Sequence, residues 1–307
     1  MMRVHLVPPM HFLSRRDFLL ASSAATVAAL LPLPAGAADK RSNPKRWAVG
    51  CFNRPWQQWG YDAALDGIKS AGYAWTGLLT ASKTEVLSNS DATPAYLASL
   101  QQRIAQRGLK VNMAALRIKN NLPLAAAIAD TRKQVENAKT LGAEFALTFG
   151  EAKKEREAQY YKVLADAAAF GQEHGVKIVM KPHGGSSGAS DQILHAIATV
   201  GHPNFSIWYD AGNIIYYTGK DPVAELEPIA QHVTGLCAKD CDKQRGEVMI
   251  QFGAGKVDFA GVFRVLKKAG FSGPIMVECC KIGATAAETT ANARANRLFL
   301  EKALASV

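Results

Sequence analysis

The feature that most constrains the fold is a regular alternation of short apolar runs with longer amphipathic segments. Eight such pairs fill the chain from residue 47 to residue 305. Short runs rich in Val, Ile and Phe are typical of parallel strands buried on both faces, and the longer segments have the period of helices. Eight strand–helix units in about 270 residues predict an α/β fold, a single-domain (β/α)8 TIM barrel.

The predicted strands are the runs WAVGCFN, WTGLL, LKVNMAAL, EFALTFG, VKIVMK, FSIWYD, VTGLCAKD and GPIMVEC. This assignment leaves no second domain and no spare element. An open doubly wound sheet is the alternative architecture, but CFNRPWQQWG is not the Gly-rich phosphate turn that usually follows its first strand. The predicted helices lie at residues 61–72, 94–108, 124–141, 155–174, 190–200, 221–231, 258–269 and 285–305.

Residues 1–37 are assigned to an export signal and residues 38–307 to the barrel. Arg15 and Arg16 precede a short apolar stretch, and Ala35-Gly36-Ala37 supplies an A-x-A cleavage site. The stretch 18–33 is shorter than the roughly 20 apolar residues of a membrane span, so no stable membrane insertion is expected. The sequence therefore predicts a twin-arginine signal peptide and a periplasmic or otherwise exported protein.

Composition excludes some function classes. The net charge is +10, but the basic residues are scattered and no long basic run interleaves with aromatic residues, so nucleic acid binding is not predicted. The five cysteines have irregular spacing that fits neither a disulfide framework nor a zinc ribbon, and they are expected to be small apolar strand residues. The oligomeric state stays open.

Polar side chains gather where the later predicted strands end, which is where (β/α)8 barrels place their reacting groups. Asp210 and Glu278 end apolar strands, and an unpaired charge there costs several kcal/mol. Lys181 is the obvious cation for both. Glu151 has two interpretations, a site residue or the solvated start of a helix. The strand-end set comprises Glu151, Lys181, His183, Asp210, Asn213, Lys239, Asp240 and Glu278.

This combination suits removal of a proton next to a carbonyl. A carboxylate takes the proton, while a metal ion or an ammonium group stabilises the developing enediolate. No pairing of a Ser or Cys nucleophile with a base is visible, so hydrolysis through such a nucleophile is not predicted. The predicted catalytic residues are Lys181, His183, Lys239 and Glu278.

The segments GVKIVMKPHGG, FSIWYDAGN, VTGLCAKD and FGAGKVDFAGVFRVLKKAGFSGPIMVE follow one another between residues 175 and 278. In this order and spacing the chain resembles the xylose isomerase-like TIM barrel superfamily, the sugar phosphate isomerase/epimerase group. The resemblance implies one divalent metal ion (Mn, Co, Zn or Mg), held by a Glu, an Asp, a His and a Glu on the last four strands. Asp210 and Glu278 match, but Lys181 and Cys237 replace the first Glu and the His.

Two outcomes follow from these replacements. In one, a metal persists, held by Asp210 and Glu278 together with His183 or Glu151. In the other, Lys181 itself supplies the positive charge. A Schiff base on Lys181 is less favourable, because a lysine flanked by carboxylates keeps its proton.

The resemblance implies a sugar isomerase or epimerase with a small-molecule sugar as its partner. The predicted export favours an unphosphorylated sugar or keto-sugar. Two alternatives stay open at this point. One is a lyase that eliminates the aglycone of a 3-keto-glycoside, and the other is a non-catalytic sugar-binding barrel that has lost its metal site.

Overall fold

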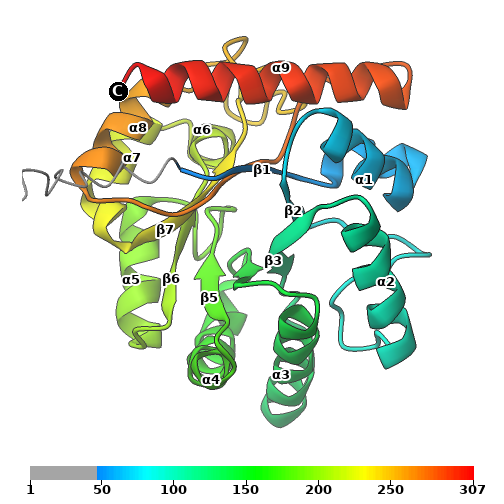
Figure 1. Cartoon of the computed structure of the whole chain (residues 1–307). Coiled ribbons are helices and arrows are strands. Elements are labelled where there is room, and N and C mark those ends of the chain that lie inside the picture. The colour runs from blue at the N-terminus through cyan, green and yellow to red at the C-terminus, as the bar shows by residue number, and fades with distance from the viewer. Residues whose placement is uncertain (1–46) are drawn as a thin grey trace, which may run out of the picture. The chain divides into compact units, whose positions relative to one another are not determined.

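The computed structural model describes residues 47–307, which form a closed parallel β-barrel surrounded by helices (Figure 1). The strands pair in sequence order, and β8 returns to pair with β1. The predicted TIM barrel is therefore confirmed, and the open sheet is excluded. The strands are β1 (Val49–Phe52), β2 (Trp75–Leu78), β3 (Lys110–Ala115), β4 (Phe145–Thr148), β5 (Lys177–Met180), β6 (Phe205–Tyr209), β7 (Val233–Ala238) and β8 (Ile275–Val277).

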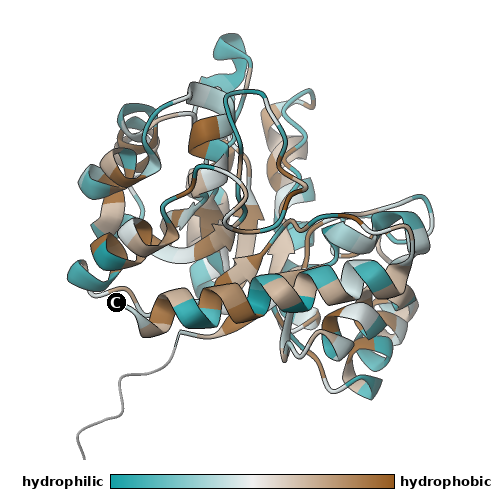
Figure 2. Cartoon of the chain, turned by 90° about the horizontal axis from the view of Figure 1, so that it is seen from above, coloured by the Kyte–Doolittle hydropathy of each residue, from teal (hydrophilic) through white to brown (hydrophobic). Residues whose placement is uncertain are grey.

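Helices follow the strands and cover the outside of the barrel (Figure 1). The strands carry mostly apolar residues, whereas the helices carry both apolar and polar ones, as expected for helices with one buried face (Figure 2). The α-helices are α1 (Tyr61–Ser70), α2 (Pro94–Gln106), α3 (Leu124–Thr140), α4 (Glu157–His174), α5 (Ser190–Val200), α6 (Ala211–Thr218), α7 (Pro222–Leu226), α8 (Phe259–Lys268) and α9 (Ala286–Ala305). Short 3-10 helices are η1 (Arg54–Trp59), η2 (Lys154–Arg156) and η3 (Glu227–His232).

The prediction of no spare element is wrong between β6 and β7. Helix α6 follows β6 at once, in a segment to which the sequence assigned no element. Asp210 caps this helix, because its Oδ1 accepts a hydrogen bond of 2.9 Å from the backbone N–H of Asn213. The single helix predicted at 221–231 is instead α7 followed by η3, with Pro228 at the start of the second piece.

A layer of apolar side chains fills the barrel interior. Phe52 and Trp208 stack with ring centroids 6.5 Å apart. Their rings need neighbouring glycines, because a Cβ at Gly77 would lie 2.4 Å from Phe52 and one at Gly235 would lie 2.3 Å from Trp208. The interior layer consists of Phe52, Leu79, Met113, Ala115, Leu147, Val179, Trp208, Cys237 and Met276.

Asp240 organises the long loop between β7 and α8. Its side chain is fully buried. The two carboxylate oxygens accept four backbone N–H groups of this loop, so the charge is satisfied within the loop itself. The donors are Cys241 at 2.8 Å, Gly253 at 2.9 Å, Gly255 at 3.0 Å and Val257 at 3.1 Å.

Asp240→Asn is expected to lower the free energy of unfolding by about 3 kcal/mol. The amide NH2 of Asn would face two of the four backbone N–H groups, and these donors would be left buried without an acceptor. Urea unfolding measures the change. Asp91→Asn is the matched control at an exposed position, where a change within about 0.5 kcal/mol is expected. Equal effects of the two substitutions would contradict the role of Asp240 in the loop.

The predicted twin-arginine signal peptide lies outside the described residues and stays a prediction. Within residues 47–307, no helix combines the length and apolar character that a membrane span requires.

Candidate active site

The strand ends bring four charged side chains together at the C-terminal mouth of the barrel. In a strand, residues two apart point to the same face. Val179, Trp208, Cys237 and Met276 belong to the interior layer, so the residues two positions later are directed inward one level higher. These residues are Lys181, Asp210, Lys239 and Glu278, and we call them the lysine–carboxylate cluster.

Each lysine of the cluster contacts both carboxylates. Lys181 Nζ lies 2.5 Å from Glu278 Oε2 and 3.1 Å from Asp210 Oδ2. Lys239 Nζ lies 2.9 Å from Glu278 Oε1 and 3.2 Å from Asp210 Oδ2. The four side chains are between 0% and 3% exposed. The cluster is therefore a buried ring of alternating charge, in which each group compensates its neighbours.

Arg54 adds a third cation to Glu278. It begins η1, two residues after the end of β1, and its Nη1 donates a hydrogen bond of 2.6 Å to Glu278 Oε1. Its side chain is 33% exposed. Arg54 was not predicted from the sequence, although its position after the first predicted strand, in CFNRPW, was the available signal.

The cluster fixes the charge of its members. Burial alone raises the pKa of the Glu278 carboxyl, but Lys181, Lys239 and Arg54 outweigh it and hold that pKa well below its usual range. Burial alone lowers the pKa of Lys239, but Asp210 and Glu278 outweigh it and raise that pKa. Glu278 is therefore ionised at neutral pH and Lys239 is protonated.

The two carboxylate oxygens of Asp210 have different partners. Oδ1 caps α6, as described above. Oδ2 lies within ion-pair distance of Lys181 and Lys239, but it is fully buried and no donor of the described residues forms a hydrogen bond with it. The two ammonium groups compensate the charge of this oxygen, and the surrounding protein covers it.

His183 lies at the rim of the mouth, where its side chain is exposed. Desolvation by the surrounding protein, followed by the charges of Lys181 and Lys239, lowers the pKa of the imidazole to about 4. The Tyr217 hydroxyl lies 3.1 Å from Nε2 and 3.2 Å from Nδ1, and Phe149 contacts the ring edge-on. His183 is therefore a neutral, accessible base at pH 7. Tyr217 and Phe149 were missed from the sequence.

Glu151 shows no contact with the cluster. Its carboxylate accepts hydrogen bonds from Asn120 Nδ2 at 2.6 Å and from the backbone N–H of Lys153 at 2.9 Å. These bonds hold the loop that follows β4. Of the sequence-predicted site residues, the structure brings Lys181, Asp210, Lys239 and Glu278 into direct contact, places His183 at the rim, and leaves Glu151 within its loop.

The sequence matches the family model described as "Xylose isomerase-like TIM barrel" over residues 65–303. The chain belongs to this family. A comparison with curated proteins found no match.

Solved structures of the family share the fold at low sequence identity. D-psicose 3-epimerase from Clostridium cellulolyticum H10 is 12% identical, with a TM-score of 0.68 over 84% of this chain and 99% of that one. An L-ribulose 3-epimerase is 16% identical, with a TM-score of 0.65 over 85% and 95%. A probable 3-DHS dehydratase from Bacillus anthracis is 12% identical, with a TM-score of 0.64 over 83% and 99%. At these identities the similarity establishes the fold alone.

The cluster does not fit the divalent metal ion that the family resemblance implies. Asp210, Cys237 and Glu278 offer ligand atoms within 4.8 Å of one another. However, the ammonium groups of Lys181 and Lys239 already contact both carboxylates. A divalent ion about 4 Å from an ammonium group is repelled by about 8 kcal/mol at an effective dielectric constant of about 20. Burial also raises the pKa of the Cys237 thiol, which disfavours the thiolate that binds metals.

The purified protein is therefore expected to contain far less than one equivalent of Mn, Co, Zn or Mg, as measured by elemental analysis. Lys181→Glu restores the strand-five carboxylate of the family pattern and removes one ammonium group. This variant is expected to gain metal binding, measured by titration with Mn²⁺. One equivalent of metal in the unaltered protein would contradict our interpretation of the cluster.

Acidification is expected to weaken the fold through Glu278. Its folded pKa lies below the unfolded value of about 4.3, so its contribution is present above that pH and is lost as the pH falls towards the folded pKa. Glu278→Gln is expected to lower the free energy of unfolding by about 3 to 5 kcal/mol at pH 7. It is also expected to make that free energy less dependent on pH between about pH 5 and pH 3. Urea unfolding at several pH values measures both effects.

Glu155→Gln is the control for this experiment, because Glu155 is exposed. It is expected to leave both the stability and its pH dependence nearly unchanged. If Glu278→Gln retained the steep acid dependence of the unaltered protein, the pairing of Glu278 with the three cations would not be its source.

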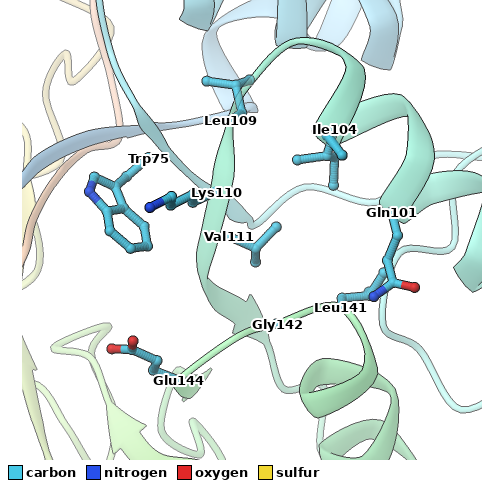
Figure 3. Close-up of a pocket in the computed structure, with 10 residues that line it drawn as sticks. Trp75, Gln101, Ile104, Leu109, Lys110, Val111, Leu141, Gly142 and Glu144 are labelled. Atoms are coloured by element: carbon cyan, nitrogen blue, oxygen red, sulfur yellow. The ribbon is translucent and has the colours of Figure 1, made fainter.

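Two cavities of the described chain lie away from the cluster. The larger, of about 400 Å³, lies at the opposite end of the barrel, where Trp75 begins β2, Lys110 begins β3 and Glu144 precedes β4 (Figure 3). The smaller, of about 260 Å³, lies beside α4 and α5 and includes Tyr161 and His195. Neither contains a member of the lysine–carboxylate cluster, so we assign the active site from the strand-end charges.

Proposed function

We propose that the protein is a sugar isomerase or epimerase that removes a proton next to a carbonyl and works without a metal ion. The observation that carries this proposal is the contact of Lys181 and Lys239 with both Asp210 and Glu278, which fixes two positive charges at the mouth. Membership of the xylose isomerase-like family supports it, as does the fold shared with structures named as sugar 3-epimerases.

The two ammonium groups stabilise the oxygen that becomes negative during the reaction. An ammonium group has three N–H donors. Lys181 and Lys239 each spend one on Glu278 in a hydrogen bond. The carboxylates hold the ammonium groups in place before the substrate arrives, so little reorganisation is needed as charge develops.

His183 is the proposed proton acceptor. The sequence predicts a carboxylate in this role, but Glu278 is buried and paired with three cations, so it does not reach the substrate carbon. The imidazole of His183 is neutral at pH 7 and accessible. It takes the proton from the carbon next to the carbonyl, the C–H electron pair forms a C=C bond, and the carbonyl π electrons move to oxygen as an enediolate. An epimer forms when water donates a proton to the opposite face of the same carbon and His183 releases its proton to solvent. An isomer forms when His183 returns its proton to the former carbonyl carbon and the adjacent hydroxyl proton passes to the former carbonyl oxygen.

Asp210 positions the ammonium groups of Lys181 and Lys239 in this proposal, through the contacts of its Oδ2. The proposed substrate is an unphosphorylated sugar or keto-sugar. This choice rests on the predicted export through the twin-arginine route, since sugar phosphates are rarely available outside the cytoplasm.

The test is deuterium uptake next to the carbonyl of D-psicose, D-tagatose and L-ribulose in heavy water containing EDTA, followed by NMR. Lys181→Met and His183→Asn are each expected to slow the exchange about 100-fold or more, because they remove the stabilising charge and the proton acceptor. Lys220→Met and His195→Asn change exposed residues of the same types and serve as controls.

Other outcomes identify other functions. Binding of keto-sugars without deuterium uptake would identify a non-catalytic sugar-binding barrel. Release of the aglycone from a 3-keto-glycoside would identify the lyase alternative, which shares the first step. Exchange that EDTA abolishes and Mn²⁺ restores would overturn the assignment of the positive charge to the lysines.

A further inference from the structure

Two arginines at the mouth are not used by the proposed reaction, Arg117 and Arg54. Arg117 is hydrogen-bonded to Leu79, the residue after β2. Arg54 is the chain neighbour of Asn53, which is hydrogen-bonded to the same residue. Arg117 Nη2 donates a hydrogen bond of 2.8 Å to the backbone oxygen of Leu79. The backbone N–H of Leu79 donates one of 3.0 Å to Asn53 Oδ1. Because Arg54 follows Asn53 in the chain, Arg54 and Arg117 lie on either side of the same residue.

Arg117 carries a charge without a carboxylate partner among residues 47–307. Its guanidinium stacks on Phe149, with Cζ 4.3 Å from the ring centroid, and the side chain is exposed at the mouth. Desolvation by its neighbours lowers the pKa of Arg117. The negative charge of Glu278 raises that pKa, but by less than desolvation lowers it. This guanidinium is therefore held in place, charged and free to bind an anion.

The charges of the mouth do not balance. The lysine–carboxylate cluster contains two cations and two anions and is neutral. Arg54 and Arg117 add two positive charges, while His183 is neutral at pH 7. At the rim, the Glu151 carboxylate is bound within its own loop, and Arg245 lies 5.1 Å from the Tyr217 ring as a further cation.

We propose that the substrate carries an oxyanion that binds Arg117 and the exposed side of Arg54. A guanidinium group binds carboxylate or phosphate oxygens through two parallel hydrogen bonds, which fixes the orientation of the ligand as well as its charge. The inference rests on the proposed function, because it names the substrate class of the same mouth: a sugar acid or another anionic sugar derivative, in preference to a neutral sugar.

The test is isothermal titration at pH 7 and constant ionic strength with D-gluconate, D-glucitol and inorganic phosphate. Gluconate and glucitol differ only in the carboxylate at one end, and both are open chains that adapt to the site. We expect an anion, gluconate or phosphate, to bind at least about tenfold more tightly than glucitol, and Arg117→Met to weaken that binding about tenfold or more. A preference for gluconate assigns the oxyanion to a carboxylate, and a preference for phosphate assigns it to a phosphate group.

Arg132→Met is the matched control, because Arg132 is a half-exposed arginine of α3 that pairs with Asp166. Arg117→Lys keeps the charge but loses the planar fork, and we expect it to retain only part of the affinity. Circular dichroism verifies the fold of each variant, and if Arg117→Met does not fold, the Arg117→Lys titration decides. Equal affinities for gluconate and glucitol, or anion binding that is unchanged in the folded Arg117 variants, would overturn the inference.

The outcomes separate this inference from the proposed function. Anion binding that depends on Arg117, without deuterium uptake by any keto-sugar, leaves the anion site standing and rejects the isomerase. Deuterium uptake by neutral keto-sugars at the same rate in Arg117→Met and in the unaltered protein would support the isomerase and reject the anion site.

Discussion

The mouth of this barrel depends on the mutual compensation of two buried lysines and two buried carboxylates. Lys181 and Lys239 each touch Asp210 and Glu278, and none of the four side chains has more than 3% exposure. Each of these charges alone would cost several kcal/mol at such a depth. The same contacts that make their burial tolerable hold the ammonium groups rigidly, so stability and the proposed chemistry have a common origin.

In the family pattern implied by the resemblance, the positive centre is an ion held by side chains. In the reaction that we propose here, the positive centre is part of the polypeptide. A covalently attached cation cannot be removed by a chelator, and it does not depend on the metal content of its surroundings. Each lysine carries one positive charge, whereas a divalent ion carries two, so one lysine stabilises a negative oxygen less strongly than the ion would. Two lysines on the same carboxylates supply the same total charge as one such ion.

The sequence predicted the barrel because strand and helix periods are local properties, and it predicted four cluster residues because they end apolar strands. It missed α6, since the capping bond of Asp210 depends on backbone geometry and the segment is short. It did not place Glu151, whose partner Asn120 comes from another loop. Arg54 and Arg117 also follow strands, but the sequence did not predict them, because the polar strand-end residues gather after the fourth and later strands. The choice between metal and lysine required the positions of the ammonium groups, which no spacing reveals.

The ion pair between Arg54 and Glu278 crosses the seam where the first and last strands meet. Arg54 is made early during synthesis and Glu278 late, so this ion pair forms only once the ring has closed. A partial barrel without β1 would expose its apolar strands and leave Glu278 without Arg54. The electrostatics of the mouth thus favour the closed cylinder over a fragment that lacks its first strand.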